Sequence, residues 1–525
     1  MTARVLFLLA VLFTFSYATT SQAADEAPNH GAAEFLDINE FRVVGNTTLP
    51  ARTIETAVYP HLGPHRTFDD VEAARLALET AYHEAGFATV FVDIPEQKVE
   101  DGIVRLHATE GRLNRVHLAG ARYFSGRQLR AELPATTAGE VPSIPALQAE
   151  LATANAKSPD RQVVPVLKAG PLPGTVDLDL NVEDHVPFHG SVELNNQYSA
   201  DTKPLRLALS VDYANLFDRF DDLSAQYQSS PQERKQVGVF AIAYARHLAG
   251  GDRLTFSFIR STSQVAAVGS LGVIGAGRIA GVHYDHTLFA APGQLQSLSF
   301  GADYKRFDQT VNAGLGVTIP TPLAYGLASA TYAGTVLGEH RNWTWSTSAD
   351  LVVRGSGSSP GAFDDKCFNC RQNQFIWRGE GAVVQQLGHG FTMTLRGAGQ
   401  LAVDPIVSNE QFLLGGAQSV RGYYEAEELG DVGYRGTLEL HAPSLFGERP
   451  VKLRPFLFGD HGRIRFQAPL DHQVDAVRIG SIGAGLDFDW THYFSGNITW
   501  ARALDAATRT RPDAARWLFE IRSTW

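Results

Sequence analysis

The sequence predicts an α+β and all-β protein: two small β-α-α-β-β domains followed by a 16-stranded transmembrane β-barrel. Three observations predict this fold. Before about residue 187, helical and strand periodicities alternate, and the same order of elements occurs twice. After it, only strand-like segments follow, joined by short and long connections in turn. The first residues form an export signal, and the last form an amphipathic strand with an aromatic final residue.

The N-terminus has the features of a signal peptide. A basic residue precedes the apolar run Val5–Phe15, which is too short to cross a bilayer but suits the centre of an export signal. Small residues at Ser21 and Ala23 favour cleavage near Ala23, so we assign residues 1–23 to the signal peptide and 24–35 to a short N-terminal segment. No later segment has the ~18 consecutive apolar residues of a transmembrane helix. We therefore expect any membrane-spanning region of the mature chain to be a closed barrel.

Composition excludes one class of partner and favours β structure. The chain has 45 basic and 56 acidic residues, so it lacks the positive charge that is typical of nucleic-acid binding. Glycine, phenylalanine and tyrosine are frequent, with 49, 30 and 16 copies, as is usual for extended β proteins. We therefore expect a β-rich chain with no nucleic-acid partner.

Residues 36–110 are predicted to form the first small domain. Thr67 is a suitable N-cap for a helix, Asp70 stands at its third position, and Gly86 can end it. Apolar periodicity places the other elements. The expected order is a strand at Phe41–Asn46, a short helix from Pro50 to about Tyr59, a longer helix from Thr67 to Gly86, and strands at Ala88–Ile94 and Gly102–Thr109.

Residues 111–185 repeat this order and are predicted to form the second small domain. Each repeat is about 70 residues long, which is enough for one compact unit. The expected elements are a strand at Arg112–Gly120, helices at Ser125–Leu133 and about Ile144–Ala156, and strands at Arg161–Leu167 and Thr175–Val182.

Residues 186–525 are predicted to form the barrel. In the second strand, Leu205, Leu207 and Leu209 fall on one face, whereas Arg206 falls on the other. An apolar face and a charged face, repeated along the chain, suit lipid outside and a wet lumen inside. Two soluble β-sandwiches are the alternative, but the even strand count and the aromatic C-terminal strand favour a barrel. The predicted strands start near residues 188, 204, 221, 235, 252, 277, 296, 322, 341, 373, 390, 431, 451, 478, 493 and 514.

The longest connection in the barrel, residues 402–430, joins the eleventh and twelfth strands and is expected on the extracellular side. It has no predicted secondary structure, and the lumen of a large barrel has room for it. Its arginine, Arg421, would need an anionic partner if buried. On the thirteenth strand, Asp460 shares its parity with Lys452 and Arg454, which predicts that its carboxylate faces the lumen. We therefore predict an Arg421–Asp460 pair that anchors the loop to the wall.

Two motifs carry a family resemblance. The segment Ser419–Tyr423, "SVRGY", is followed after about 30 residues by an F-x-D-x-G motif. With the two small domains and the strand count, these motifs resemble those of two-partner secretion (type Vb) outer-membrane transporters, the haemolysin secretion/activation family, whose small domains are called POTRA domains. The resemblance implies a lumen-loop motif of Val420, Arg421, Gly422 and Tyr423, and a barrel-wall partner motif of Phe458, Asp460 and Gly462.

The same resemblance implies a role in protein export. POTRA domains at 36–110 and 111–185 would lie in the periplasm and capture an unfolded exoprotein, partly by β-augmentation. The barrel, in the lipid of the bacterial outer membrane, would pass this partner to the cell surface without ATP. The resemblance further implies a large β-helical partner of the haemolysin or adhesin type, a monomeric transporter, and neither catalysis nor a cofactor. A factor that assembles other barrels is the alternative within the superfamily, and a diffusion porin is a more distant one.

One departure from the family pattern concerns the pore. Some members carry an N-terminal helix that plugs it, but residues 24–35 show little helical periodicity. The sequence therefore gives no support for such a plug and leaves open whether the pore is plugged at rest.

Four short motifs of enzymes or metal sites lack the context that their chemistry needs. The G-x-G-x-x-A run in Val273–Ala280 would need a following helix to bind a dinucleotide, but a strand pattern follows it. The G-x-S-x-G run at 357–361 lies in a polar loop rather than at a strand-to-helix turn. A Gly-Pro pair between His61 and His65 breaks the helix that metal binding would need. The acidic segment Glu425–Asp431 has no ligand spacing and is expected on a solvated loop face. We therefore expect no catalytic residues and no metal site.

The only two cysteines, Cys367 and Cys370, lie close together in the long loop after the ninth strand. In an exported protein their simplest interpretation is a local disulfide. Because this bridge closes a very short loop, we expect it to shape the loop tip rather than to stabilise the fold.

Overall fold

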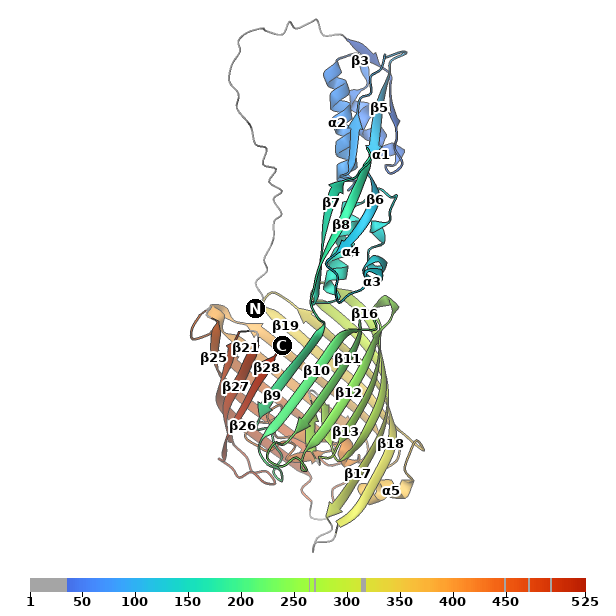
Figure 1. Cartoon of the computed structure of the whole chain (residues 1–525). Coiled ribbons are helices and arrows are strands. Elements are labelled where there is room, and N and C mark those ends of the chain that lie inside the picture. The colour runs from blue at the N-terminus through green and yellow to red at the C-terminus, as the bar shows by residue number, and fades with distance from the viewer. Residues whose placement is uncertain are drawn as a thin grey trace. The chain divides into compact units, whose positions relative to one another are not determined.

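The computed structural model describes residues 35–263, 265–268, 271–312, 318–447, 450–470, 473–491 and 493–525 (Figure 1). The predicted signal peptide, 1–23, and all but the last residue of segment 24–35 lie outside the described residues. The chain forms two compact units, and the boundary between them runs through the second small domain. Among the described residues, no helix is both long and apolar enough to cross a bilayer.

The first small domain places its helices on a three-stranded sheet. Its elements are β1 (Leu36–Ile38), β2 (Glu40–Val44), α1 (Ala51–Val58), η1 (Tyr59–His61), β3 (Gly63–Arg66), α2 (Phe68–Glu84), β4 (Val90–Asp93) and β5 (Ile103–Glu110). The sheet order is β2-β5-β4, with β2 parallel and β4 antiparallel to β5. Thr67 and Asp70 form the capping box that starts α2, and Leu78 and Tyr82 on that helix are fully buried in the core.

A small additional sheet, which the sequence did not predict, includes His65. Strand β3 pairs with β1 in an antiparallel ribbon, and the two strands are only four and three residues long. Such short strands show no periodicity in the sequence. His61 ends η1 and His65 lies in β3, so the two histidines do not share a helix.

The second small domain repeats the order strand, two helices, two strands. Its elements are β6 (Arg112–Ala119), α3 (Gly126–Glu132), η2 (Pro134–Thr136), α4 (Ile144–Ala156), β7 (Arg161–Ala169) and β8 (Thr175–Asp184). The strands form one sheet in the order β6-β8-β7, with β6 and β7 at its edges.

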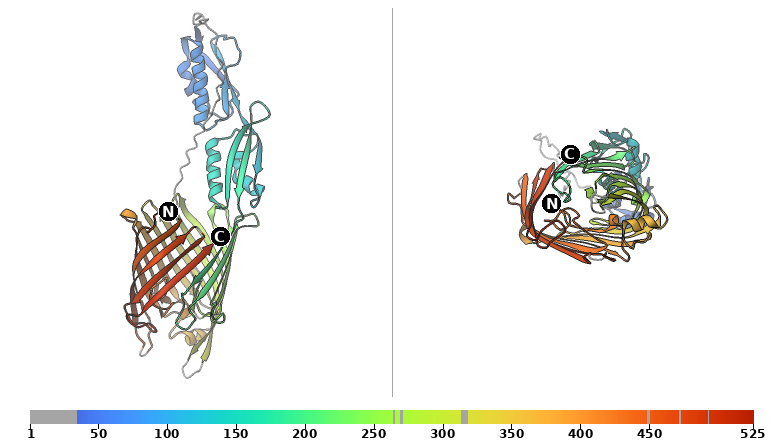
Figure 2. Two further views of the ribbon diagram at one scale, coloured as in Figure 1. Left: turned by 60° about the vertical axis from the view of Figure 1, so that its left-hand side comes forward. Right: turned by 90° about the horizontal axis from the view of Figure 1, so that it is seen from below.

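The barrel is a closed ring of sixteen antiparallel strands, which confirms the predicted fold class (Figure 2). Its strands are β9 (Phe188–Asn195), β10 (Arg206–Leu216), β11 (Asp221–Ser229), β12 (Gly238–His247), β13 (Arg253–Ser261), β16 (Gly277–Ala291), β17 (Gln294–Asn312), β18 (Thr318–Leu337), β19 (Arg341–Val353), β20 (Phe375–Gln386), β21 (Thr392–Ala402), β24 (Val432–His441), β25 (Val451–Arg465), β26 (Ala476–Trp490), β27 (Phe494–Ala503) and β28 (Ala515–Thr524). The largest error in a predicted strand start is at β18, which begins at Thr318 rather than at residue 322.

The connections alternate between short turns and long loops, as predicted. The long loops carry structure of their own: a hairpin of β14 (Val265–Val268) and β15 (Leu271–Ile274), and the helix α5 (Pro360–Lys366). By this alternation, the long-loop end of the barrel is the extracellular end. It is also the end at which the lumen loop enters.

Candidate functional site

The lumen loop, residues 402–430, folds back along the inner wall of the barrel. It contains η5 (Ser408–Glu410) and an antiparallel pair of β22 (Phe412–Leu414) and β23 (Glu428–Gly430), so the prediction that it has no secondary structure was wrong. A cavity of about 1010 Å³ lies between this loop and side chains of the barrel strands. The loop therefore occupies part of the lumen and leaves an open space beside itself.

Arg421 at the tip of the loop binds the wall through a buried ion network. Its Nε and Nη2 atoms donate to the two oxygens of Asp460 at 2.8 and 2.7 Å, and its backbone N–H donates to the same carboxylate at 3.0 Å. Its remaining nitrogen, Nη1, donates to Glu439 at 2.7 Å, and its Cζ lies 3.5 Å from the centroid of the Phe458 ring. Arg421 is only 7% exposed. Guanidinium geometry matches this bidentate arrangement, which a lysine could not reproduce.

Glu439 is the wall partner that sequence reasoning missed. It stands on β24, beside β25, which carries Asp460. Its Oε1 also accepts from Arg396 at 2.6 Å, and its Oε2 lies 3.3 Å from a ring nitrogen of His441. The sequence did carry one signal for Glu439. In the strand predicted to start near residue 431, it falls on the face that points into the lumen.

The two glycines of the motifs allow the loop to approach the wall closely. Gly422 has a φ of 92°, a backbone conformation that side-chain-bearing residues rarely adopt. At Gly462 on β25, an added Cβ would lie 2.6 Å from a methyl carbon of Leu414 in β22. A larger residue at either position would therefore move the loop away from the strand that holds it.

The hydrophobic members of the lumen-loop motif pack against the barrel wall beside Arg421. Val420 and Tyr423 are fully buried in a cluster with Ile464, Ile479 and Ala503 on the wall. The Tyr423 hydroxyl lies 2.9 Å from the carbonyl oxygens of Gly480 and Asp505 and accepts a hydrogen bond from the backbone N–H of Asp505. Each side chain of the motif thus has a defined partner on the wall.

A second anchor near the base of the loop has the opposite polarity. Glu410, in η5, accepts hydrogen bonds from Lys305 at 2.7 Å, the Tyr325 hydroxyl at 2.6 Å and Arg378 at 3.0 Å. Arg378 also pairs with Asp350. Here the loop supplies the anion and the wall supplies the cations. Sequence reasoning did not find this site, because Glu410 lies in no motif and its partners come from three distant strands.

The acidic segment after the motif is bound rather than solvated, so that expectation was wrong. Glu427 accepts hydrogen bonds from the backbone N–H groups of Arg509 at 2.7 Å and Thr510 at 2.6 Å, and Glu428 accepts from Thr508 N–H at 2.6 Å. Asp431 accepts from the backbone N–H groups of Ile406 and Gln467 and from the side chain of Gln411. Among the described residues, no group of three or more acidic, histidine or cysteine side chains is placed to hold a metal ion.

This segment reaches the loops on both sides of the barrel's closing seam. The seam between β9 and β28 has five residue pairs, against eight between β10 and β11. Glu427 and Glu428 bind the loop that precedes β28, and Glu425 N–H donates to Tyr198 O in the loop that follows β9. The Tyr424 ring lies edge-on to Tyr198 and 3.7 Å from the Arg516 guanidinium carbon. The lumen loop therefore ties together the two loops that flank the shortest pairing.

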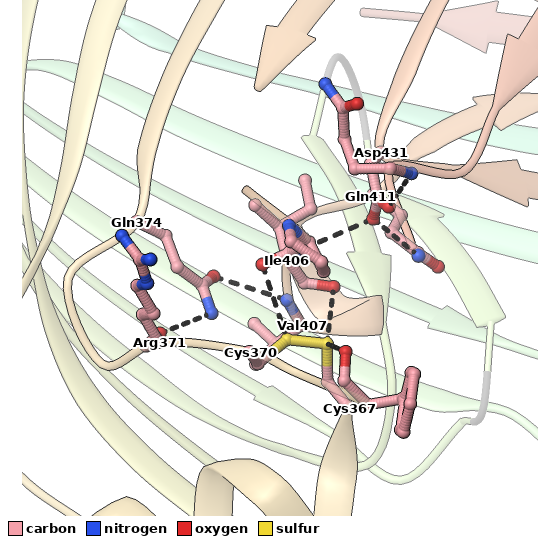
Figure 3. Close-up of a disulfide and its surroundings, with 11 residues drawn as sticks. Cys367, Cys370, Arg371, Gln374, Ile406, Val407, Gln411 and Asp431 are labelled. Carbon is pink, nitrogen blue, oxygen red and sulfur yellow. Dashed lines mark hydrogen bonds between the residues drawn. A yellow bond between two sulfur atoms is a disulfide. The ribbon is translucent and has the colours of Figure 1, made fainter. Parts of the chain in front are cut away.

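Cys367 and Cys370 form a disulfide, and it lies against the start of the lumen loop (Figure 3). The Cys367 and Cys370 sulfurs are 3.3 and 3.4 Å from the carbonyl oxygens of Ile406 and Pro405. Cys370 is buried in a cluster with Val407, whose N–H donates to Gln374 at 3.2 Å. The bridge therefore also contacts the base of the lumen loop, a contact that the sequence did not predict.

The remaining motifs take no part in a site. Gly277, the second glycine of the G-x-G-x-x-A run, begins strand β16, so the helix that a dinucleotide needs is replaced by a strand. Ser359 of the G-x-S-x-G run is the N-cap of the short helix α5, in the loop between β19 and β20.

Comparison with known proteins gives the following matches. A family model described as haemolysin secretion/activation protein ShlB/FhaC/HecB matches residues 174–488, and a model of the ShlB-type POTRA domain matches residues 36–111. The outer membrane transporter CdiB of Dickeya dadantii is 22% identical over 448 residues, which cover 78% of this chain and 73% of that protein.

Solved structures agree on the fold. CdiB from Escherichia coli has a TM-score of 0.58 at 18% identity, covering 96% of this chain and 93% of that one. CdiB from Acinetobacter baumannii has a TM-score of 0.55 at 15% identity, covering 96% and 91%. BamA from Haemophilus ducreyi lacking POTRA domains 1–3 has a TM-score of 0.57 at 12% identity, covering 93% and 100%. At these identities the likeness concerns the fold alone.

Proposed function

The chain belongs to the haemolysin secretion/activation family of two-partner secretion transporters, and we propose that it captures an unfolded partner exoprotein and moves it across the outer membrane without ATP. As a member it is an outer-membrane transporter whose POTRA domains lie in the periplasm. The family implies a secreted partner. The observation that carries the proposal is the lumen loop, which is held to the wall by Arg421 beside an open cavity.

The proposed capture step uses the edges of the small-domain sheets. Strands β4 and β7 are edge strands, and each carries apolar side chains exposed to solvent: Phe91 on β4 and Val164 and Leu167 on β7. An edge strand offers unpaired backbone groups to an extended segment of another chain. An unfolded partner has such segments in abundance, whereas a folded one does not. We assign capture to residues 36–110 and 111–185.

The proposed transport path is the cavity beside the lumen loop. Its lining carries both signs of charge: Arg206, Arg396, Arg435 and Arg522, with Glu193, Glu380 and Glu520. A mixed lining binds no single sequence tightly, which suits the passage of a long chain. We propose that folding of the partner outside the cell supplies the direction of movement. The partner we expect is large and β-helical, of the haemolysin or adhesin type, and we expect the transporter to act as a monomer in outer-membrane lipid.

Deletion of residues 36–184 tests whether the small domains capture the partner while the barrel forms the pore. The truncated barrel should insert and conduct ions, because its strands close without the small domains, but it should export no partner. Conductance in planar bilayers and partner release into the medium measure the two activities separately. Sustained export by the truncated protein would refute capture by the POTRA domains. Loss of other outer-membrane barrels from cells that lack the full-length protein would instead favour the alternative role in barrel assembly.

A further inference from the structure

Several arginines face outward on the barrel near its extracellular end. On β25, Ile464 is buried against the lumen loop, so the alternation of the strand points Arg463 and Arg465 away from the lumen. Arg478 on β26 stands directly opposite Arg463, whereas the next residue, Ile479, is buried on the inner side. Charged side chains on the lipid-facing surface of a barrel are unfavourable unless they lie at headgroup level.

Exposed aromatic side chains place these arginines at headgroup level. Tyr434 on β24 stands directly opposite Arg463 and is 51% exposed. Trp377 on β20 and Trp517 on β28 are likewise exposed and lie near the ends of their strands on the long-loop side. Belts of tyrosine and tryptophan mark the membrane–water interface of such barrels. The arginines therefore meet the headgroups of the outer leaflet.

Arg463, in the arginine pair across β25 and β26, lacks a compensating anion. Like charges directly opposite each other on neighbouring strands destabilise the pair. Within the described part of the chain, the Arg463 side chain has no hydrogen-bond or ion-pair partner, and the Arg465 side chain reaches only the amide oxygen of Gln467. Arg478 has one acidic neighbour, Asp505, at 3.7 Å. An external anion between Arg463 and Arg478 would attract both guanidinium groups and so offset their mutual repulsion.

A groove beside the arginines has the shape and chemistry of a lipid site. It has a volume of about 690 Å³ and is lined by Trp377, Gly399, Leu401, Tyr434, Arg463 and Arg465. The aromatic and aliphatic side chains suit acyl chains, and the arginine end suits phosphate, which guanidinium groups bind with paired hydrogen bonds.

We propose that Arg463, Arg465 and Arg478 bind the phosphate groups of a phosphorylated glycolipid in the outer leaflet, with its acyl chains in this groove. The proposal rests on the proposed function in so far as that places the barrel in outer-membrane lipid. Its consequence concerns the lumen: Asp460, which holds Arg421, lies on the same strand three positions before Arg463. A bound headgroup would therefore brace from outside the wall section that anchors the lumen loop from inside.

The test compares the full-length protein with an Arg463→Gln/Arg478→Gln variant in diphosphoryl lipid A, in the same lipid without phosphates, and in inorganic phosphate alone. Arg341→Gln is the matched control, because Arg341 begins β19 at the short-turn end and stacks on the exposed Trp343. Retained lipid is counted by native mass spectrometry. We expect the double variant to bind diphosphoryl lipid about tenfold more weakly, and the control to bind normally.

The thermal midpoint of unfolding is a second readout. Its expected change has opposite signs in detergent and in lipid, which distinguishes loss of the lipid site from a general loss of stability. In lipid-free detergent, Arg463→Gln should raise the thermal midpoint because it removes a repulsion; in diphosphoryl lipid it should lower the midpoint relative to wild type. A lower midpoint in both media, or equal lipid retention by the double variant, would overturn the site. Equal stabilisation by inorganic phosphate would show an adventitious ion only and overturn the lipid assignment. Partner export is measured separately, so that failure of either proposal is visible without the other.

Discussion

The two anchors of the lumen loop are built with opposite polarity and reach different parts of the wall. At the tip, the loop cation Arg421 binds Glu439 and Asp460, which lie 18 and 39 positions away in the sequence. At the base, the loop anion Glu410 binds Arg378, Tyr325 and Lys305, at separations of 32, 85 and 105. The tip is held by β24 and β25, which follow the loop in the sequence. The base is held by β17, β18 and β20, which precede it. Release of either anchor would therefore leave the loop tethered by the other, but it would free a different part of the loop.

Arg421→Ala should have the largest effect on export. It leaves Asp460 buried without its cation, which costs roughly 3–5 kcal/mol of local stability, and it frees the loop tip to enter the cavity. We expect partner secretion to fall to near background while the barrel still inserts, as measured by partner in the medium and by heat-modifiable migration. Arg435→Ala is the matched control, because Arg435 faces the same cavity from β24. Secretion at the wild-type level by Arg421→Ala would exclude the proposed role.

Arg421→Lys tests whether the charge of Arg421 is sufficient to hold the loop tip, or whether its bidentate geometry is needed. Lysine keeps the charge but cannot span both oxygens of Asp460 and reach Glu439 together. We therefore expect secretion between that of Arg421→Ala and wild type. If lysine restored secretion fully, charge alone would hold the tip and the bidentate geometry would be irrelevant.

Glu410→Gln should affect export less than Arg421→Ala but should loosen the barrel more widely. The amide keeps the shape of the side chain and removes the charge that neutralises Lys305 and Arg378, so the loss is that of a broken buried ion pair, roughly 3–5 kcal/mol. A lower temperature of heat-modifiable unfolding, with measurable export, is the expected result. Glu380→Gln, at another lumen-facing acid, serves as control. Equal unfolding temperatures for the two variants would show that the base anchor does not hold the loop.

The two anchors also differ in how far the sequence predicts them. The barrel strands were predictable because lipid on one face and water on the other force a period of two, and that same parity turned Asp460 inward. The shortest strands were not predicted, because a strand of three residues is too short to show any periodicity. These strands are β1, β22 and β23. Glu410 resembles any loop glutamate, because its significance arises from strands that the closed ring brings beside it. Long-range contacts of this kind leave no local pattern.

The acidic segment offers a third, weaker hold on the same loop. Glu427→Ala removes three hydrogen bonds to Arg509 and Thr510, two of them to backbone N–H groups, which is about 1–3 kcal/mol if part of each is replaced by water. We expect faster cleavage of residues 504–514 by protease added to intact cells, with export only slightly reduced. Glu427→Gln keeps an acceptor oxygen and should be cleaved at an intermediate rate. Equal cleavage of all three proteins would mean that the segment does not secure the loops beside the seam.

The disulfide should have the smallest effect, although it touches the base of the loop. Cys367 and Cys370 are separated by three positions, so their bridge closes too little chain to restrict the unfolded state much. Cys367→Ser/Cys370→Ser should therefore export nearly as well as wild type, because Phe363 and Val407 still fill the cluster around Cys370. Maleimide labelling of folded, unreduced wild type should find no free thiol, and labelling after reduction should find both. Ready labelling without reductant would rule out the bridge. A large export defect in the serine variant would mean instead that the disulfide, and not Glu410, holds the base of the lumen loop.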